Sequence, residues 1–204
     1  MPPAASDPAE GGGRAGGRPR DPGLDARILA AAEQRLREYG YAGMSIEAVA
    51  AAAGTSVPSV RRRYLDRAAL AAAVIDAWRA EPLPPPRGPA RRRALAVLEN
   101  FGRNLALGDS MPLLGTLLAE ESRHPELIGR FRARLVKPRR AMLADAIKAG
   151  VREGELPWDT EVDAVVNMLI GSFYARYIAR GAIPRDWAAR VLGQVWPPAK
   201  PDPR

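Results

Sequence analysis

Residues 43–70 read G-M-S-I-E-A-V-A-A-A-A-G-T-S-V-P-S-V-R-R-R-Y-L-D-R-A-A-L and predict two short helices joined by a tight turn. Ser45 is placed to cap the first helix, which ends at Gly54. Ser56 is placed to cap the second helix, and Pro58 falls in its first turn, where the missing N–H costs no hydrogen bond. The pattern indicates a helix-turn-helix motif.

The second of these helices has an inward and an outward face. Val60 and Tyr64 share the inward face, while the small side chains of Ala50 and Ala53 let the first helix pack closely. The outward face starts with small side chains and ends with basic ones. Such a helix suits the DNA major groove, because small side chains let its backbone approach the base edges. The outward residues are Val57, Pro58, Ser59, Arg61, Arg62 and Arg63.

Composition divides the chain into four segments. Residues 1–23 are rich in glycine and proline and poor in large apolar side chains, which predicts a disordered basic arm. Residues 24–80 are expected to form the DNA-binding domain, including a linking helix that Asp66 caps. Prolines in 81–90 break helical hydrogen bonding, which predicts a linker, and we expect a regulatory and dimerisation domain over 91–198.

The remaining pattern is helical throughout, and no segment alternates as a strand would. We therefore expect an all-α protein of about nine helices, in which a three-helix helix-turn-helix domain precedes a larger helical domain. Pro138 should kink or divide one of the later helices. In that part of the chain, helices are predicted over 89–107, 112–122, 125–149, 160–180 and 185–195.

The residue types that the chain lacks exclude most enzyme classes. It has no cysteine and one histidine, His124, so thiolate chemistry and the usual metal-ligand sets are missing. Glu120 and Glu121 cannot act as an acid/base pair, because adjacent helical residues point about 100° apart. We expect no enzymatic activity, no catalytic residues, no metal site and no cofactor.

Charge and hydropathy indicate the kind of partner and the compartment. The net charge is +8, from 31 basic and 23 acidic residues, which suits a polyanionic partner. The chain has neither a run of 18 apolar residues nor a signal-peptide pattern. We therefore expect a cytoplasmic protein that makes no membrane contact.

Residues 43–70 resemble the helix-turn-helix signature of the TetR family in register and without gaps, and the likeness extends from Asp21 to about Ala80. Residues 123–140 and 170–184 are similar to one common type of TetR C-terminal domain. The resemblance implies a bacterial transcription regulator that binds a double-stranded DNA operator as a homodimer and responds to a small molecule.

The resemblance also implies which residues contact DNA. Arg61 and Arg63 would hold phosphates, although the family usually has Tyr and His there, and either guanidinium can reach a guanine instead. Arg18 and Arg20 in the arm can enter the minor groove, or the arm can remain a solvated linker. The expected contacts are Ser45, Thr55, Val57, Pro58, Ser59, Arg61, Arg62, Arg63, Tyr64, Arg67, Arg18 and Arg20.

Two further sets of residues are expected in the C-terminal domain. The last two helices resemble those that pair as a four-helix dimer bundle, although their apolar residues can also simply close the protomer's own core. The dimer residues expected are Val162, Val166, Leu169, Ile170, Phe173, Tyr177, Val191 and Val195. An apolar or amphipathic effector is expected in a cavity lined by Phe101, Asn104, Leu105, Met111, Leu114, Leu118, Phe131, Met142 and Met168.

The function predicted is a repressor that binds a palindromic operator and is released by its effector. The alternative is a helical protein that binds DNA or a protein partner without any effector. An enzyme is the weakest of the three hypotheses, for the reasons given above.

Overall fold

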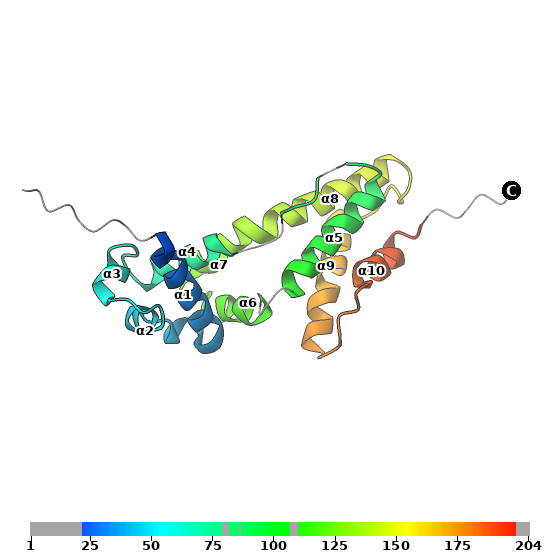
Figure 1. Ribbon diagram of the computed structural model, residues 1–204. Coiled ribbons are helices and arrows are strands. Elements are labelled where there is room, and N and C mark those ends of the chain that lie inside the picture. Colours follow the sequence, from blue (N-terminus) through cyan, green and yellow to red (C-terminus); the bar gives the residue numbers. More distant parts are fainter. Residues whose placement is uncertain (1–21, 79–81, 86, 107–109, 199–204) are drawn as a thin grey trace, which may run out of the picture.

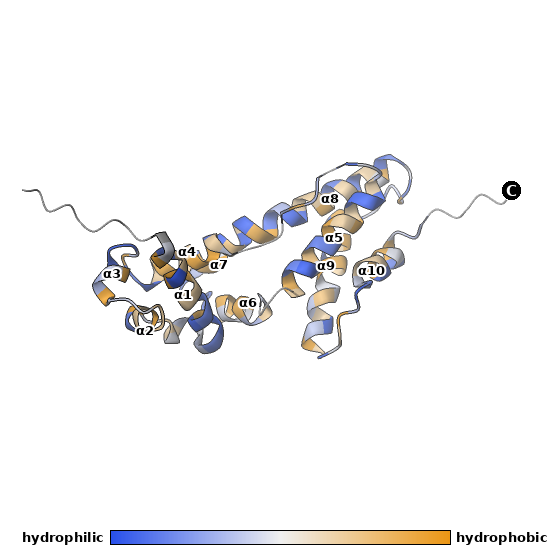
Figure 2. Cartoon of the chain, in the orientation of Figure 1, coloured by the Kyte–Doolittle hydropathy of each residue, from blue (hydrophilic) through white to orange (hydrophobic). Residues whose placement is uncertain are grey.

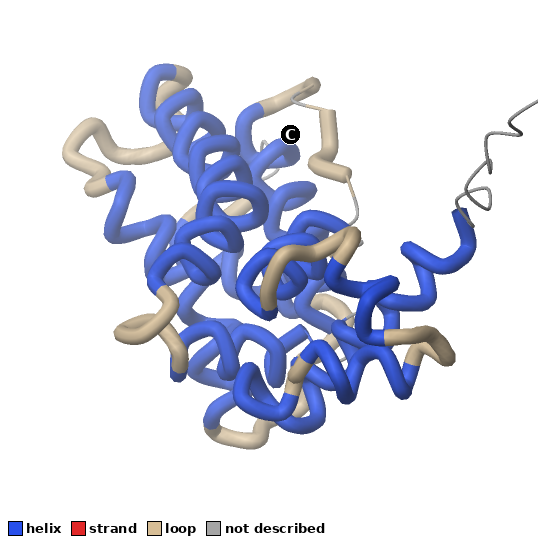
Figure 3. The backbone as a smooth tube through the Cα atoms, turned by 90° about the vertical axis from the view of Figure 1, so that its left-hand side faces the viewer, coloured by secondary structure: helices blue, strands red, loops and turns tan. Residues whose placement is uncertain are grey.

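The computed structural model describes residues 22–78, 82–85, 87–106 and 110–198, and all regular secondary structure in these ranges is helical. The all-α prediction is confirmed. Because α7, η1 and α8 follow one another without a gap, the described ranges contain nine separate helical rods, the number that the sequence predicts. Tan loops and blue helices alone make up the described chain in Figure 3.

The N-terminal helices begin at the caps that the sequence predicts. Ser45 accepts a hydrogen bond from the Ala48 amide (3.1 Å) and Asp66 from the Ala69 amide (2.7 Å). The first helix continues through Gly40, which has φ +67° and kinks it. The bounds are α1 Pro22–Gly43, α2 Ile46–Ala52, α3 Val57–Arg61 and α4 Arg67–Ala77.

A long rod made of α7, η1 and α8 runs through the C-terminal part (Figure 1). Its π-helical segment η1 lies just before Pro138, which occupies the first turn of α8. Proline cannot donate to the preceding turn, and a π turn is one way in which a helix absorbs that break. The bounds are α5 Ala90–Ala106, α6 Ser110–Ala119, α7 Pro125–Phe131, η1 Arg132–Val136, α8 Lys137–Arg152, α9 Val162–Ile178 and α10 Trp187–Val195.

Two hydrophobic cores hold these helices together. The first core joins α1–α4 to α6 and α7, and the second joins α5 to α8, α9 and α10. Figure 1 shows the two groups at opposite ends of an elongated molecule, and in Figure 2 their helices are striped with apolar and polar residues. Although a linker over 81–90 was expected to separate two domains, the packing is shared across it, because α6 and α7 return to α1 and α4.

Candidate functional site

The α2–α3 turn has the geometry of a helix-turn-helix. Gly54 has φ +63°, a conformation that glycine adopts without strain, and it ends α2. Ser56 then caps α3 by accepting a hydrogen bond from the Ser59 amide (3.4 Å). Val60 is fully buried against Val49 and Ala50 in the first core, so the angle between the two helices is set by apolar packing.

The outward face of α3 is largely open to solvent. Pro58, Arg61 and Arg62 are exposed, whereas Thr55, Val57 and Ser59 are half-buried. Tyr64 is half-buried at the end of the helix, and its pKa is raised, first by burial and then by the negative charge of Asp25. The residues expected near base edges therefore share one accessible surface at the start of α3.

Two of the three arginines at the end of α3 are engaged by carboxylates from other helices. Arg61 pairs with Glu47 in the first turn of α2 at 3.4 Å. Arg63 pairs with Asp25 in the first turn of α1 and also donates to the Ser59 carbonyl oxygen at 3.1 Å. The pKa of Glu47 is lowered by a hydrogen bond with its own backbone and by the charge of Arg61.

Arg62 differs from both of its neighbours. It donates to the Ser59 hydroxyl at 2.9 Å and is exposed. Within the described residues it makes no ion pair with a carboxylate. Of the three guanidinium groups, that of Arg62 is thus the one presented to an approaching polyanion without an internal acidic partner.

Arg67, at the start of α4, is held by aromatic stacking. Its guanidinium lies 4.1 Å from the Tyr41 ring centroid and donates to the Tyr41 carbonyl oxygen at 3.3 Å. The other neighbour of Tyr41 is His124, whose ring centroid is 4.4 Å away. The Tyr41 ring therefore lies between His124, in the α6–α7 connection, and Arg67, an expected phosphate contact.

The other expected sites stand as follows. Arg18 and Arg20 lie outside the described residues. Among the residues that the structure places, no group of acidic, histidine or cysteine side chains is arranged to hold a metal ion. None of the helices placed is both long and apolar enough to cross a lipid bilayer.

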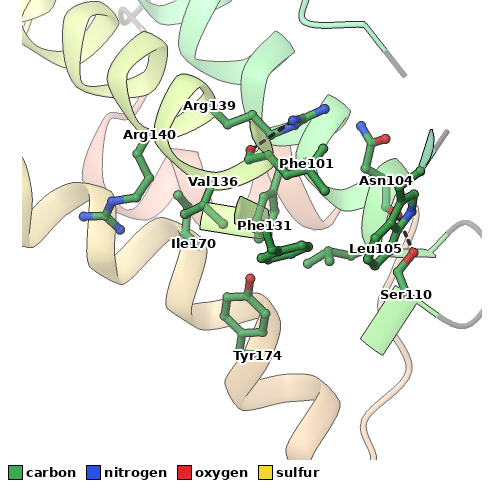
Figure 4. A pocket seen from close by; sticks show the side chains of 12 residues that line it. Phe101, Asn104, Leu105, Ser110, Phe131, Val136, Arg139, Arg140, Ile170 and Tyr174 are labelled. Atoms are coloured by element: carbon green, nitrogen blue, oxygen red, sulfur yellow. Dashed lines mark hydrogen bonds between the residues drawn. The ribbon is translucent and has the colours of Figure 1, made fainter. Parts of the chain in front are cut away.

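A cavity of about 150 Å³ lies where the two cores meet. Trp78 at the end of α4 and Phe131 of α7 form one wall, with their ring centroids 5.6 Å apart. Phe101, Asn104 and Leu105, which sequence reasoning assigned to the effector cavity, come from α5. Figure 4 shows the Tyr174 hydroxyl pointing toward Phe131 and the middle of the cavity.

Few polar groups line this cavity. Arg139 is buried and donates to the Asn100 side-chain oxygen at 3.1 Å, and desolvation lowers its pKa. Tyr174 has a pKa raised by burial, so its hydroxyl remains protonated and can donate a hydrogen bond. Arg140 points away from the cavity in Figure 4 and pairs with Asp163 at 2.8 Å.

A wider groove of about 510 Å³ opens on the other side of Phe131, Val136 and Tyr174. Met111, Leu114 and Leu118, all expected in the effector cavity, line this groove instead of the smaller cavity. Met142 is packed against the second core. Met168 is 55% exposed and lies in a separate shallow hollow beside Val195, so the structure does not bring the expected residues into one site.

The residues expected at the dimer interface also fall into separate groups. Val166, Leu169, Ile170 and Phe173 are buried in the protomer's own second core. Val162, Val191 and Val195 pack partly against that core, and Tyr177 is 44% exposed. Between the exposed polar residues Asp163, Asn167 and Arg176, one stripe along α9 carries small or apolar residues that are exposed or, for Gly171, half-buried: Ala164, Met168, Gly171, Ala175 and Ile178.

Sequence reasoning missed several residues of the cavity. Ile170 was noted only for the dimer, and Tyr174 was not singled out. An amphipathic pattern predicts that such residues face inward, but it does not predict which helices meet around a space. The missed residues are Trp78, Ser110, Leu135, Val136, Arg139, Arg140, Ile170 and Tyr174.

Two family models match the chain and together cover most of it. One, described as bacterial regulatory proteins of the tetR family, matches residues 28–74. The other, described as the tetracyclin repressor-like C-terminal domain, matches residues 84–195. The first match contains the helix-turn-helix, and the second contains most of the cavity lining.

Relatives and solved structures agree with these matches. An uncharacterized HTH-type transcriptional regulator of Mycobacterium tuberculosis is 30% identical over 180 residues, covering 86% of this chain and 88% of the relative. YdeS, another such regulator, from Bacillus subtilis, is 24% identical over 177 residues, covering 86% and 89%. The crystal structure of a TetR-family regulator from Rhodococcus shares the fold, with a TM-score of 0.65, 20% identity and coverage of 85% and 97%.

Proposed function

This chain belongs to the TetR family of bacterial transcription regulators, and we propose that it represses genes by binding an inverted-repeat operator as a homodimer that a small molecule releases. The family consists of regulators and not of enzymes, and its helix-turn-helix implies DNA binding. The observation that carries the proposal is the solvent-accessible face of α3, which lies within the matched motif. This face has small side chains at its start and basic side chains at its end. Because the operator is chromosomal DNA, we also propose a cytoplasmic location.

The operator contacts proposed are those that share the surface of α2, α3 and the start of α4. Val57, Pro58 and Ser59 would approach base edges, while Ser45 and Arg67 at two helix starts would hold phosphates. Arg61 and Arg63 would reach phosphate or guanine once they leave their carboxylate partners. Arg18 and Arg20 remain proposed minor-groove contacts.

Dimerisation is proposed to use α9 and α10. One helix-turn-helix covers a single half-site, so affinity for an operator calls for two of them in fixed register. The uncharged stripe along α9 supports this assignment, because Ala164, Gly171 and Ala175 allow a partner helix to approach closely. The four residues buried in the protomer's core would support that face from behind.

The effector is proposed to be an apolar or amphipathic molecule that accepts a hydrogen bond from Tyr174. The cavity wall is largely aromatic and aliphatic, and the hydroxyl of Tyr174 points into the cavity in Figure 4. Because Trp78 ends α4 and the lining belongs to both cores, a ligand here would contact both cores at once. Its binding would therefore change how α4 sits against the C-terminal helices.

The proposal is tested by selecting random-sequence duplexes on the purified protein through several rounds and sequencing the survivors. An inverted repeat is expected, and its half-site would locate the regulated genes and so suggest the effector. If the folded protein enriches no sequence, it is not a specific reader of DNA, and the alternative of a helical protein that binds a protein partner takes its place.

A further inference from the structure

The acidic partners of the α3 arginines lie on the proposed DNA-binding surface itself. We propose that Asp25 and Glu47 are specificity-determining residues, which hold Arg63 and Arg61 in ion pairs and thereby lower the affinity of the protein for random DNA. This inference rests on the proposed DNA-binding function. It assigns a role to two residues that carry the same sign of charge as DNA.

The Arg63 pair is the more enclosed of the two. Only 18% of the Arg63 side chain is exposed, and the Ser59 carbonyl oxygen fixes the same guanidinium from the other side. Asp25 comes from α1, 38 residues away in sequence, so the contact depends on tertiary packing and not on helix register. A DNA phosphate that approaches the Nε–H of this guanidinium would have to replace Asp25.

The Arg61 pair is more exposed to solvent, but it also joins an arginine at the end of α3 to a carboxylate from another helix. Arg61 and Glu47 are each about three-fifths exposed, at 62% and 61%, and their charged atoms are 3.4 Å apart. Glu47 lies two residues after Ser45, the expected phosphate contact that caps α2. Glu47 therefore lies within the proposed DNA-binding surface itself.

These pairs penalise random DNA more than the operator. Affinity for random DNA comes almost wholly from cations that displace the counterions of phosphates, and a guanidinium already paired with a carboxylate contributes little to that exchange. An operator offers a correctly placed guanine edge or phosphate. A bidentate contact of the arginine with that group replaces the broken arginine–carboxylate ion pair. The two carboxylates thus widen the difference between the two affinities.

The test uses the full chain with Asp25→Asn and Glu47→Gln, singly and together, since both replacements keep the side-chain shape and remove the charge. Binding of a fluorescent random-sequence duplex is titrated by anisotropy at several salt concentrations. We expect the double variant to bind this duplex roughly tenfold more tightly, with a salt dependence steeper by about one to two phosphates. Affinity for the selected operator should rise less, so the ratio of the two affinities should fall.

Asp186→Asn is the matched control, because it removes a carboxylate from an exposed ion pair with Arg190 (2.8 Å) on α10. It changes net charge by the same amount as each single variant. The inference is overturned if the Asp25→Asn and Glu47→Gln variants bind the random duplex no more tightly than the wild type, or only as much more tightly as this control. It is also overturned if the ratio of operator affinity to random-duplex affinity does not change. The random-duplex titration needs no operator, so failure of the wild-type chain to select one would contradict the proposed function separately.

Discussion

Three consecutive arginines end α3, yet their surroundings give them different tasks. Arg62 is exposed and bonded only to a serine hydroxyl, whereas Arg61 and Arg63 start in ion pairs. Replacing Arg62 with alanine should weaken binding to operator and random duplexes alike and reduce the salt dependence by about one phosphate. Anisotropy titrations over a salt series measure both quantities. Arg190→Ala on α10 is the control, and a salt dependence equal to that of the wild type would refute the phosphate contact.

Gly150 shows how one missing side chain fixes a packing arrangement. The Trp196 indole is nearly fully buried and lies directly over this glycine, so an added Cβ would overlap it. Gly150→Ala should lower the free energy of unfolding by about 1–3 kcal/mol, because the core cannot expand without strain. Urea denaturation of the variant measures the loss. Gly129→Ala, where the added Cβ meets open space, should leave stability near that of the wild type; equal stability of the two variants would contradict this packing account.

Helix ends were the most predictable feature, because they depend on neighbours in sequence. Ser45, Ser56 and Asp66 cap the helices that the sequence assigns to them. The pairing of Arg63 with Asp25 could not be predicted in this way, since the two residues are 38 positions apart. The meeting of Trp78, Phe101 and Tyr174 around the cavity depends in the same way on how α4, α5 and α9 pack.

Along α9, core residues occupy one side, and the residues proposed to face a partner protomer occupy another. Met168, on its outer face, is 55% exposed, so Met168→Arg should leave the protomer folded. A two-fold interface would bring two such arginines together, and we expect the dimer dissociation constant to rise roughly a hundredfold or more. Sedimentation equilibrium measures this change. Ala141→Arg on the exposed side of α8 is the control, and a Met168→Arg protein that still dimerises like the wild type would exclude this face.

Shared packing, and not residues 81–90 alone, connects the two ends of the molecule. The first core contains α6 and α7 as well as α1–α4, and the proposed effector cavity touches both cores. If the effector weakens operator binding by some factor, then operator must weaken effector binding by the same factor. Isothermal titration of the identified effector with and without a saturating operator duplex measures this. Equal effector affinities would contradict the coupling.

The central claim is that two copies of this chain read one operator together. The selected operator and the same duplex with about five base pairs inserted between its half-sites should be compared by anisotropy titration. The insertion turns one half-site by half a helical turn, out of reach of a dimer with fixed spacing. The affinity for the lengthened duplex is expected to fall to about that of a duplex with a single half-site. Equal affinity for both duplexes would show that each copy binds independently and would contradict the central claim.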